Sequence, residues 1–172
     1  MKSFENKVAA ITGAGSGIGR ALALGLARQG CHVALSDVNS AGLKETAELV
    51  RKLGVKASEA LVNVADRDAV QAWADQVMAE YGQVNAIFNN AGVAQGGTVE
   101  GNDYADYEWV MSINFWGVVN GTKAFLPYLK SSGEGHIVNT SSIFGLFAQP
   151  GMSAYNASKF AVRGFTESLR QE

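Results

Sequence analysis

The chain has 172 residues, of which 47% are hydrophobic and 17% charged, and its formal net charge is −2. This predicts one globular domain over residues 1–172 and excludes a disordered chain. No basic block suited to nucleic acid or an anionic membrane is present, and no apolar run could cross a bilayer. The polar start lacks a secretory signal, and the single Cys31 excludes an internal disulfide, so we expect a cytoplasmic protein.

Residues 7–11 predict a buried strand and residues 21–29 a helix, with the glycine-rich segment 12–20 between them. Its pattern is T-G-x-x-x-G-x-G, because Ile18 stands where the common G-x-G-x-x-G has its last glycine. Glycines let the backbone approach a pyrophosphate, and a helix N-terminus offers free N–H groups. The segment therefore predicts a phosphate site, with a tight turn that needs positive φ as the alternative.

A second strand, residues 32–37, ends in Asp37, which lies 24 residues after Gly13. An acid about 20 residues after the glycine turn is placed to hydrogen-bond the adenosine ribose. Asp37 would also repel a 2′-phosphate, and no Lys or Arg stands at position 16, 38 or 39 to bind one, which favours NAD over NADP. Alternatively, Asp37 caps the next helix, a role that Ser40 could also fill.

The middle of the chain predicts a helix over 41–53, a strand over 55–64, a helix over 66–81 with an aspartate N-cap, and a strand over 84–88. The last of these strands runs into Asn89-Asn90-Ala91-Gly92. Polar amides at the carboxyl end of a strand lie where open α/β sheets bind ligands. A turn rich in Asn and Gly explains the same residues equally well.

The last part predicts a long helix over 104–129, a strand over 136–140 and a helix over 153–172 that is still running at the end. The first of these helices carries apolar residues on more than one face, which predicts a second buried face such as a subunit contact. Strands that alternate with helices predict a doubly wound parallel sheet with helices on both faces.

Tyr155 and Lys159 lie four residues apart in the last predicted helix and are therefore neighbours on one face. A phenol beside an ammonium is an acid/base pair, because the cation favours the phenolate. Ser142, thirteen residues before Tyr155, could hold a substrate oxygen against the phenol. For the tyrosine and lysine alone, a surface pair is the alternative, since Tyr-x-x-x-Lys is common by chance.

These motifs, in this order, resemble those of the short-chain dehydrogenase/reductase superfamily in its common single-domain form. The resemblance covers all 172 residues and the first two thirds of the family's chain. It implies a Rossmann-like parallel sheet with strand order 3-2-1-4-5. The family's last strands and substrate lid have no counterpart, so we expect a chain truncated after the catalytic helix, with one sheet edge uncovered.

The resemblance implies that Tyr155 is the general acid/base and that Lys159 favours its phenolate and holds the nicotinamide ribose. Ser142 would orient the substrate oxygen, and Asn114 would anchor a water in a proton relay. The implied cofactor contacts are Gly13, Ser16, Gly17, Ile18, Gly19, Asp37, Asn63, Val64, Asn90, Ala91 and Gly92, besides Tyr155 and Lys159. The family usually has an aspartate at position 63. We further expect Gln95, Ile143, Phe144 and Met152 to edge the substrate pocket, and no metal site.

The implied function is NAD-dependent interconversion of a secondary alcohol and a ketone. One alternative is an NAD-binding but inactive fragment or subunit, because the last third of the family's chain is missing. Another is an NADP-linked ketoacyl-type reductase, against which Asp37 argues. A homodimer or homotetramer through the helices at 104–129 and 152–172 is expected.

Overall fold

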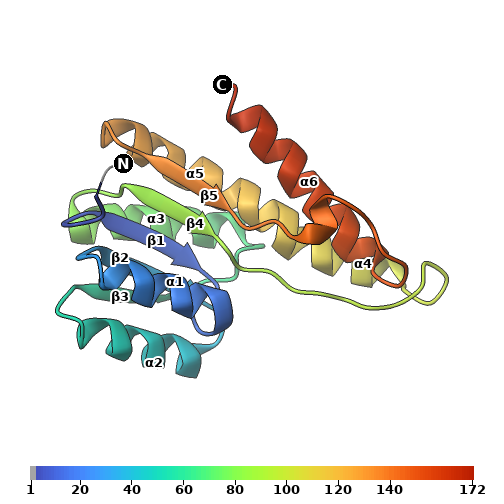
Figure 1. The fold of residues 1–172 in the computed structure, drawn as a ribbon, viewed down its shortest axis with the longest axis horizontal. Coiled ribbons are helices and arrows are strands. Elements are labelled where there is room, and N and C mark those ends of the chain that lie inside the picture. Colours follow the sequence, from blue (N-terminus) through green and yellow to red (C-terminus); the bar gives the residue numbers. More distant parts are fainter. Residues whose placement is uncertain (1–2) are drawn as a thin grey trace.

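The computed structural model describes residues 3–172 and is built on one parallel sheet in the order β3-β2-β1-β4-β5 (Figure 1). This confirms the predicted class and strand order. The strands are β1 (Val8–Thr12), β2 (His32–Asp37), β3 (Ala57–Leu61), β4 (Ala86–Asn89) and β5 (His136–Asn139). In register, Val8 lies opposite His32 and Ala9 opposite Ala86. β5 is the edge strand next to β4, and its Val138 is 42% exposed, as expected for an uncovered edge.

Helices cover both faces of the sheet (Figure 1). One face carries α1 (Gly17–Ala27) and α2 (Ser40–Arg51), and the other carries α3 (Arg67–Tyr81) and α5 (Gly117–Ser131). Side chains of β1 alternate between the two cores: Ala10 packs with α3 and α5, whereas Ile11 packs with α1 and α2. Because β1 is buried on both faces, its residues form the continuous apolar run seen in the sequence.

Some predicted helix bounds are wrong, and the helix predicted over 104–129 contains a π-helical segment. α1 begins at Gly17 instead of position 21, so the end of the glycine motif forms its first turn. The helix expected over 104–129 is α4 (Tyr104–Met111), a π-helical segment (Ser112–Trp116) and α5. The last helix, α6 (Ser153–Leu169), ends three residues before the chain does. Apolar periodicity does not detect a π turn, because one extra residue per turn leaves the local composition unchanged.

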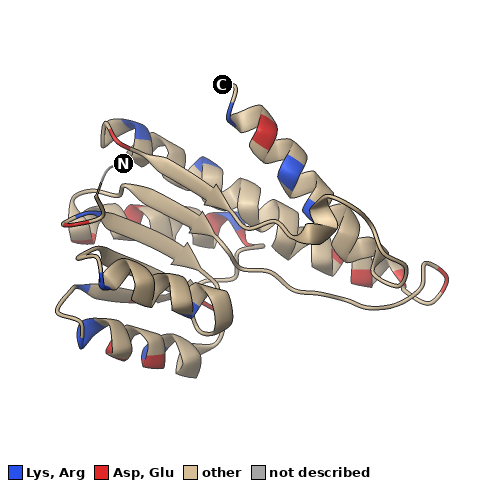
Figure 2. Ribbon diagram, viewed as in Figure 1, with Lys and Arg blue, Asp and Glu red and all other residues tan. Residues whose placement is uncertain are grey.

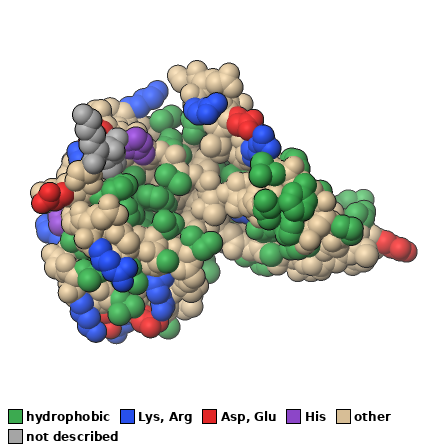
Figure 3. Space-filling model, viewed as in Figure 1, with side chains coloured by type: hydrophobic (Ala, Val, Ile, Leu, Met, Phe, Trp, Pro, Cys, Tyr) green, Lys and Arg blue, Asp and Glu red, His purple; other side chains and the backbone are tan. Residues whose placement is uncertain are grey.

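Cations and anions are interspersed over the outer faces of α2 and α6 (Figure 2). Within residues 3–172, no helix is both long enough and apolar enough to span a bilayer. Hydrophobic side chains gather over the part of the molecule that carries α6 and the loop before it (Figure 3). In that loop Ile143, Leu146 and Phe147 are each more than half exposed.

Candidate active site

The carboxyl ends of the strands open into a cavity of about 680 Å³. All of the residues predicted to contact the cofactor line this cavity, and so does Ser142. The remaining lining residues, which the sequence did not single out as contacts, are Val38, Val62, Val93, Ala94, Ile113, Thr140 and Ser141. The four residues expected to edge a substrate pocket, Gln95, Ile143, Phe144 and Met152, do not line it.

The glycine-rich turn forms one wall of the cavity. Gly13 and Gly17 have φ of 66° and 50°, a region that favours glycine. A Cβ on Gly13 would lie 2.8 Å from the Cα of Ala91, whereas one on Gly17 would meet no atom within 4 Å beyond its chain neighbours and its own helix backbone. The turn thus leaves open space in front of the α1 N-terminus, whose first N–H groups have no partner within the helix. This cradle fits the pyrophosphate of a dinucleotide.

Asp37 does not cap α2, and neither does Ser40. The N-cap is Asn39, whose Oδ1 accepts a hydrogen bond from the Gly42 N–H at 3.1 Å. The carboxylate of Asp37 instead accepts from the Gly15 N–H at 2.7 Å and from the Asn39 N–H at 2.8 Å. A carboxylate has about four acceptor positions, so Asp37 keeps capacity for two ribose hydroxyls.

Thr12 joins the ends of β1 and β4 beneath the cavity. Its Oγ1 accepts from the N–H groups of Asn90 and Ala91 at 2.9 and 3.0 Å. In return, the Asn90 side-chain amide donates to the Thr12 carbonyl at 3.1 Å. The sequence placed Thr12 in the glycine motif but assigned no role to its hydroxyl. These bonds fix the Asn90-Ala91-Gly92 segment against the glycine turn.

Replacing Thr12 with valine should lower the free energy of unfolding by about 2–4 kcal/mol, because two backbone N–H groups near the buried Thr12 side chain lose their acceptor. Urea unfolding measures this. Thr98→Val is the matched control: Thr98 Oγ1 also accepts a backbone N–H, that of Gly101, but at an exposed site where water can replace it. Equal losses for the two variants would contradict the role given to Thr12.

Asn114 lies behind the cavity wall, in the π-helical segment, and is 0% exposed. Its Oδ1 accepts from the Val93 N–H at 2.8 Å, and its Nδ2 donates to the Val93 carbonyl at 2.9 Å. Nδ2 also reaches Ser158 Oγ at 3.0 Å. The side chain therefore ties the segment after β4 to α6. Ser158 was missed in the sequence, where its only signal is its place beside Lys159.

The predicted acid/base pair lies on α6 and faces the cavity. Lys159 is 4% exposed, and its Nζ lies 5.6 Å from the centre of the Tyr155 ring and donates to the Thr140 carbonyl at 3.0 Å. Burial disfavours the ammonium and lowers the pKa of Lys159 from its ordinary value. Phe144 packs edge-on against the Tyr155 ring, which fixes its orientation.

Ser142 is the N-cap of the short 3₁₀ helix Ile143–Gly145 after β5, and its Oγ accepts from the Phe144 N–H at 3.2 Å. The hydroxyl proton remains available to a substrate oxygen. The neighbouring Ser141 lines the cavity and also donates to the Lys159 carbonyl at 3.1 Å. A Cβ on Gly145 would lie 2.8 Å from that carbonyl. The turn thus packs directly on the helix that carries Tyr155.

Among residues 3–172, no group of three or more His, Cys, Asp or Glu side chains could hold a metal ion. Burial raises the pKa of the Cys31 thiol to about 12, which makes it a poor ligand and a poor nucleophile.

A family model described as short chain dehydrogenase matches residues 7–172. The oxidoreductase named SadH, from Mycobacterium tuberculosis, is 58% identical over 172 residues, which cover 100% of this chain and 62% of that protein. This chain is also similar to a short-chain dehydrogenase/reductase from Burkholderia phymatum solved with NAD (TM-score 0.95, 42% identity, 98% of this chain and 60% of that one). A structure of NAD⁺-bound xylitol dehydrogenase gives a TM-score of 0.94 at 36% identity, covering 98% of this chain and 65% of that one. The fold, the motifs and a family model that matches nearly the whole chain together show the family: the chain belongs to the short-chain dehydrogenases.

Proposed function

We propose that the chain is the NAD-binding and catalytic part of an oxidoreductase that interconverts a secondary alcohol and a ketone. One observation carries this proposal: a single cavity joins the glycine turn and Asp37 to Ser142, Tyr155 and Lys159. A dinucleotide cradle and an acid/base pair thus face the same space. Two similar solved structures hold NAD, which supports the choice of cofactor.

Bound NAD would supply the acceptor for the hydride that leaves the carbinol carbon. The chain's own part is to move the proton: the phenolate of Tyr155 takes it from the substrate hydroxyl, and in the reverse direction the phenol returns it to the alkoxide. The ammonium of Lys159 stabilises the phenolate charge, and the Ser142 hydroxyl donates to the substrate oxygen. A positioned acid/base of this kind contributes about 10²–10⁴-fold to the rate.

The remaining predicted roles belong to the same proposal. Asn63 and Val64 would flank the adenine. Asn63 Oδ1 accepts from the Ala65 N–H at 3.0 Å, which orients the side chain, and its amide N–H₂ would donate to the base. A Cβ on Gly92 would lie 3.2 Å from Asn114 Oδ1 and 3.6 Å from Lys159 Nζ. Asn114 and Lys159 therefore flank the same glycine, where Asn114 would anchor a water that relays protons to Lys159.

Two further parts of the proposal concern assembly and location. Trp109, Trp116 and Phe160, from α4, the π-helical segment and α6, are each more than 40% exposed, which supports a homodimer or homotetramer through these helices. The unpaired thiol of Cys31 suits a reducing compartment and supports a cytoplasmic location.

The test incubates the purified chain with a panel of apolar secondary alcohols and either NAD or NADP, and follows formation of the reduced cofactor. We expect turnover with NAD to exceed that with NADP by at least about tenfold, because Asp37 repels the 2′-phosphate. Binding of NAD without any turnover would favour an inactive fragment or subunit. Higher turnover with NADP would favour the ketoacyl-type reductase and contradict the role given to Asp37.

A further inference from the structure

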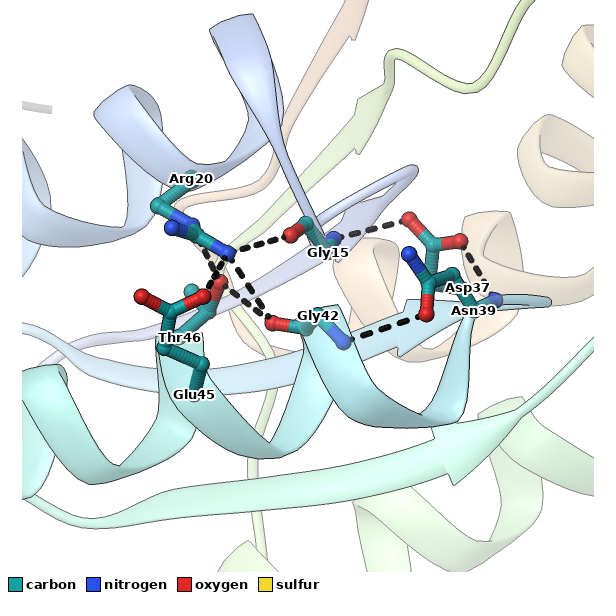
Figure 4. A network of polar contacts seen from close by, with 7 residues as sticks. All are labelled: Gly15, Arg20, Asp37, Asn39, Gly42, Glu45 and Thr46. Carbon is teal, nitrogen blue, oxygen red and sulfur yellow. Dashed lines mark hydrogen bonds and ion pairs between the residues drawn. The ribbon is translucent and has the colours of Figure 1, made fainter.

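Arg20 lies on α1, outside the cavity, and ties the glycine turn to α2 (Figure 4). Its Nη2 donates to the Gly15 carbonyl at 2.7 Å and forms an ion pair with Glu45 at 2.7 Å. Its Nε donates to Thr46 Oγ1 at 2.9 Å, and that hydroxyl donates in turn to the Gly42 carbonyl at 3.0 Å. One guanidinium therefore holds both the turn and the first turns of α2.

Two glycines allow the close approach that Arg20 secures. A Cβ on Gly15 would lie 2.9 Å from Asp37 Oδ2, and one on Gly42 would lie 2.6 Å from the Gly15 carbonyl oxygen. Gly15 therefore has a partner on each side, since its N–H donates to Asp37 and its carbonyl accepts from Arg20. The position of the Asp37 carboxylate depends on a turn that Arg20 holds from the opposite side.

We propose that Arg20 is a positioning residue for cofactor recognition: by holding the Gly15 carbonyl toward α2, it keeps the Gly15 N–H on Asp37 and fixes that carboxylate for the adenosine ribose. This inference rests on the proposed function. A fixed carboxylate presents ordered acceptors to the 2′- and 3′-hydroxyls and cannot turn away from a 2′-phosphate. Arg20 thus supports both NAD affinity and discrimination against NADP, although its own charge is committed to Glu45.

The test measures the dissociation constants of NADH and NADPH by calorimetry. The main variant is the double substitution Arg20→Gln with Glu45→Gln, which removes one cation and one anion and so leaves the local net charge unchanged. We expect the dissociation constant for NADH to rise about tenfold and that for NADPH to change far less. The ratio of the NADPH dissociation constant to the NADH dissociation constant therefore falls. Damage to the fold alone would weaken both cofactors equally and leave this ratio unchanged.

Two controls sharpen the result. Glu45→Gln alone keeps Arg20 on Gly15 and should leave the NADH dissociation constant within about twofold. Arg51→Gln removes an arginine at the last residue of α2, the end away from Asp37, that also bonds a backbone carbonyl and a glutamate. It should change neither constant. If the double variant does not fold, Thr46→Val removes the acceptor for Arg20 Nε without changing charge, and the same fall in the ratio is expected on a smaller scale.

An unchanged ratio in a folded variant, with wild type preferring NADH, overturns the role of Arg20 and leaves the proposed function standing. A wild-type chain that prefers NADPH, or that binds neither dinucleotide, overturns the proposed cofactor and this inference with it.

Discussion

Tyr155→Phe is expected to reduce kcat by about 10²–10⁴-fold while the dissociation constant for NADH stays within about twofold. The substitution removes one oxygen and keeps the ring that packs on Phe144 and lies near Lys159. The proton acceptor is lost, but the walls of the cavity remain. Turnover of a secondary alcohol and calorimetric binding of NADH, measured on the same preparation, separate the two effects.

A second tyrosine supplies the matched control for this experiment. The hydroxyl of Tyr128 donates to Asp75 at 2.7 Å on the exposed side of α5, away from the cavity. Tyr128→Phe should therefore leave both kcat and NADH affinity unchanged. If Tyr155→Phe retained wild-type turnover, another group would have to move the proton, and the acid/base assignment would be wrong.

The parts of the fold and site that the sequence predicted are those encoded by short spacings. Apolar runs between helical segments predicted the strands, because a strand buried on both faces is apolar throughout. Tyr155 and Lys159 are four residues apart, and α6 places them on the same face, as helix geometry requires. The glycine turn similarly precedes a helix within a few residues, so its wall of the cavity could be placed from local pattern alone.

The parts that the sequence did not predict are contacts between residues far apart in the chain. Asn114 holds Val93 and Ser158, which are 21 and 44 positions away. Arg20 meets Thr46, 26 positions away, only because α1 and α2 pack together. Ser141 contacts Lys159 because the turn after β5 approaches α6 at a glycine. None of these pairs has a spacing that indicates contact before the strand order is known.

Lys159→Met is expected to abolish measurable turnover and, at the same time, to raise the free energy of unfolding by about 1–2 kcal/mol at neutral pH. The ammonium is almost fully buried and donates to a neutral carbonyl, that of Thr140. Methionine has a similar length, carries no charge and removes the desolvation cost. Without the cation, the phenolate of Tyr155 loses its stabilising charge, so the rate falls.

The pH dependence of stability separates this explanation from a packing effect. Burial lowers the pKa of Lys159 in the folded state, so between that value and its ordinary value the unfolded chain binds more protons. Wild-type stability should therefore rise with pH through this interval, and the advantage of Lys159→Met should shrink as the lysine becomes neutral. Below the folded pKa the advantage should be complete.

Urea unfolding of wild type and variant at neutral and alkaline pH measures both the size of the gain and its pH dependence. Lys52→Met, at an exposed position at the end of α2, is the control and should change neither stability nor turnover by much. A Lys159→Met variant less stable than wild type at neutral pH would mean that its contacts outweigh the cost of burying the charge. A more stable but inactive variant would mean that the fold carries this lysine for chemistry, at a position where a neutral side chain packs better.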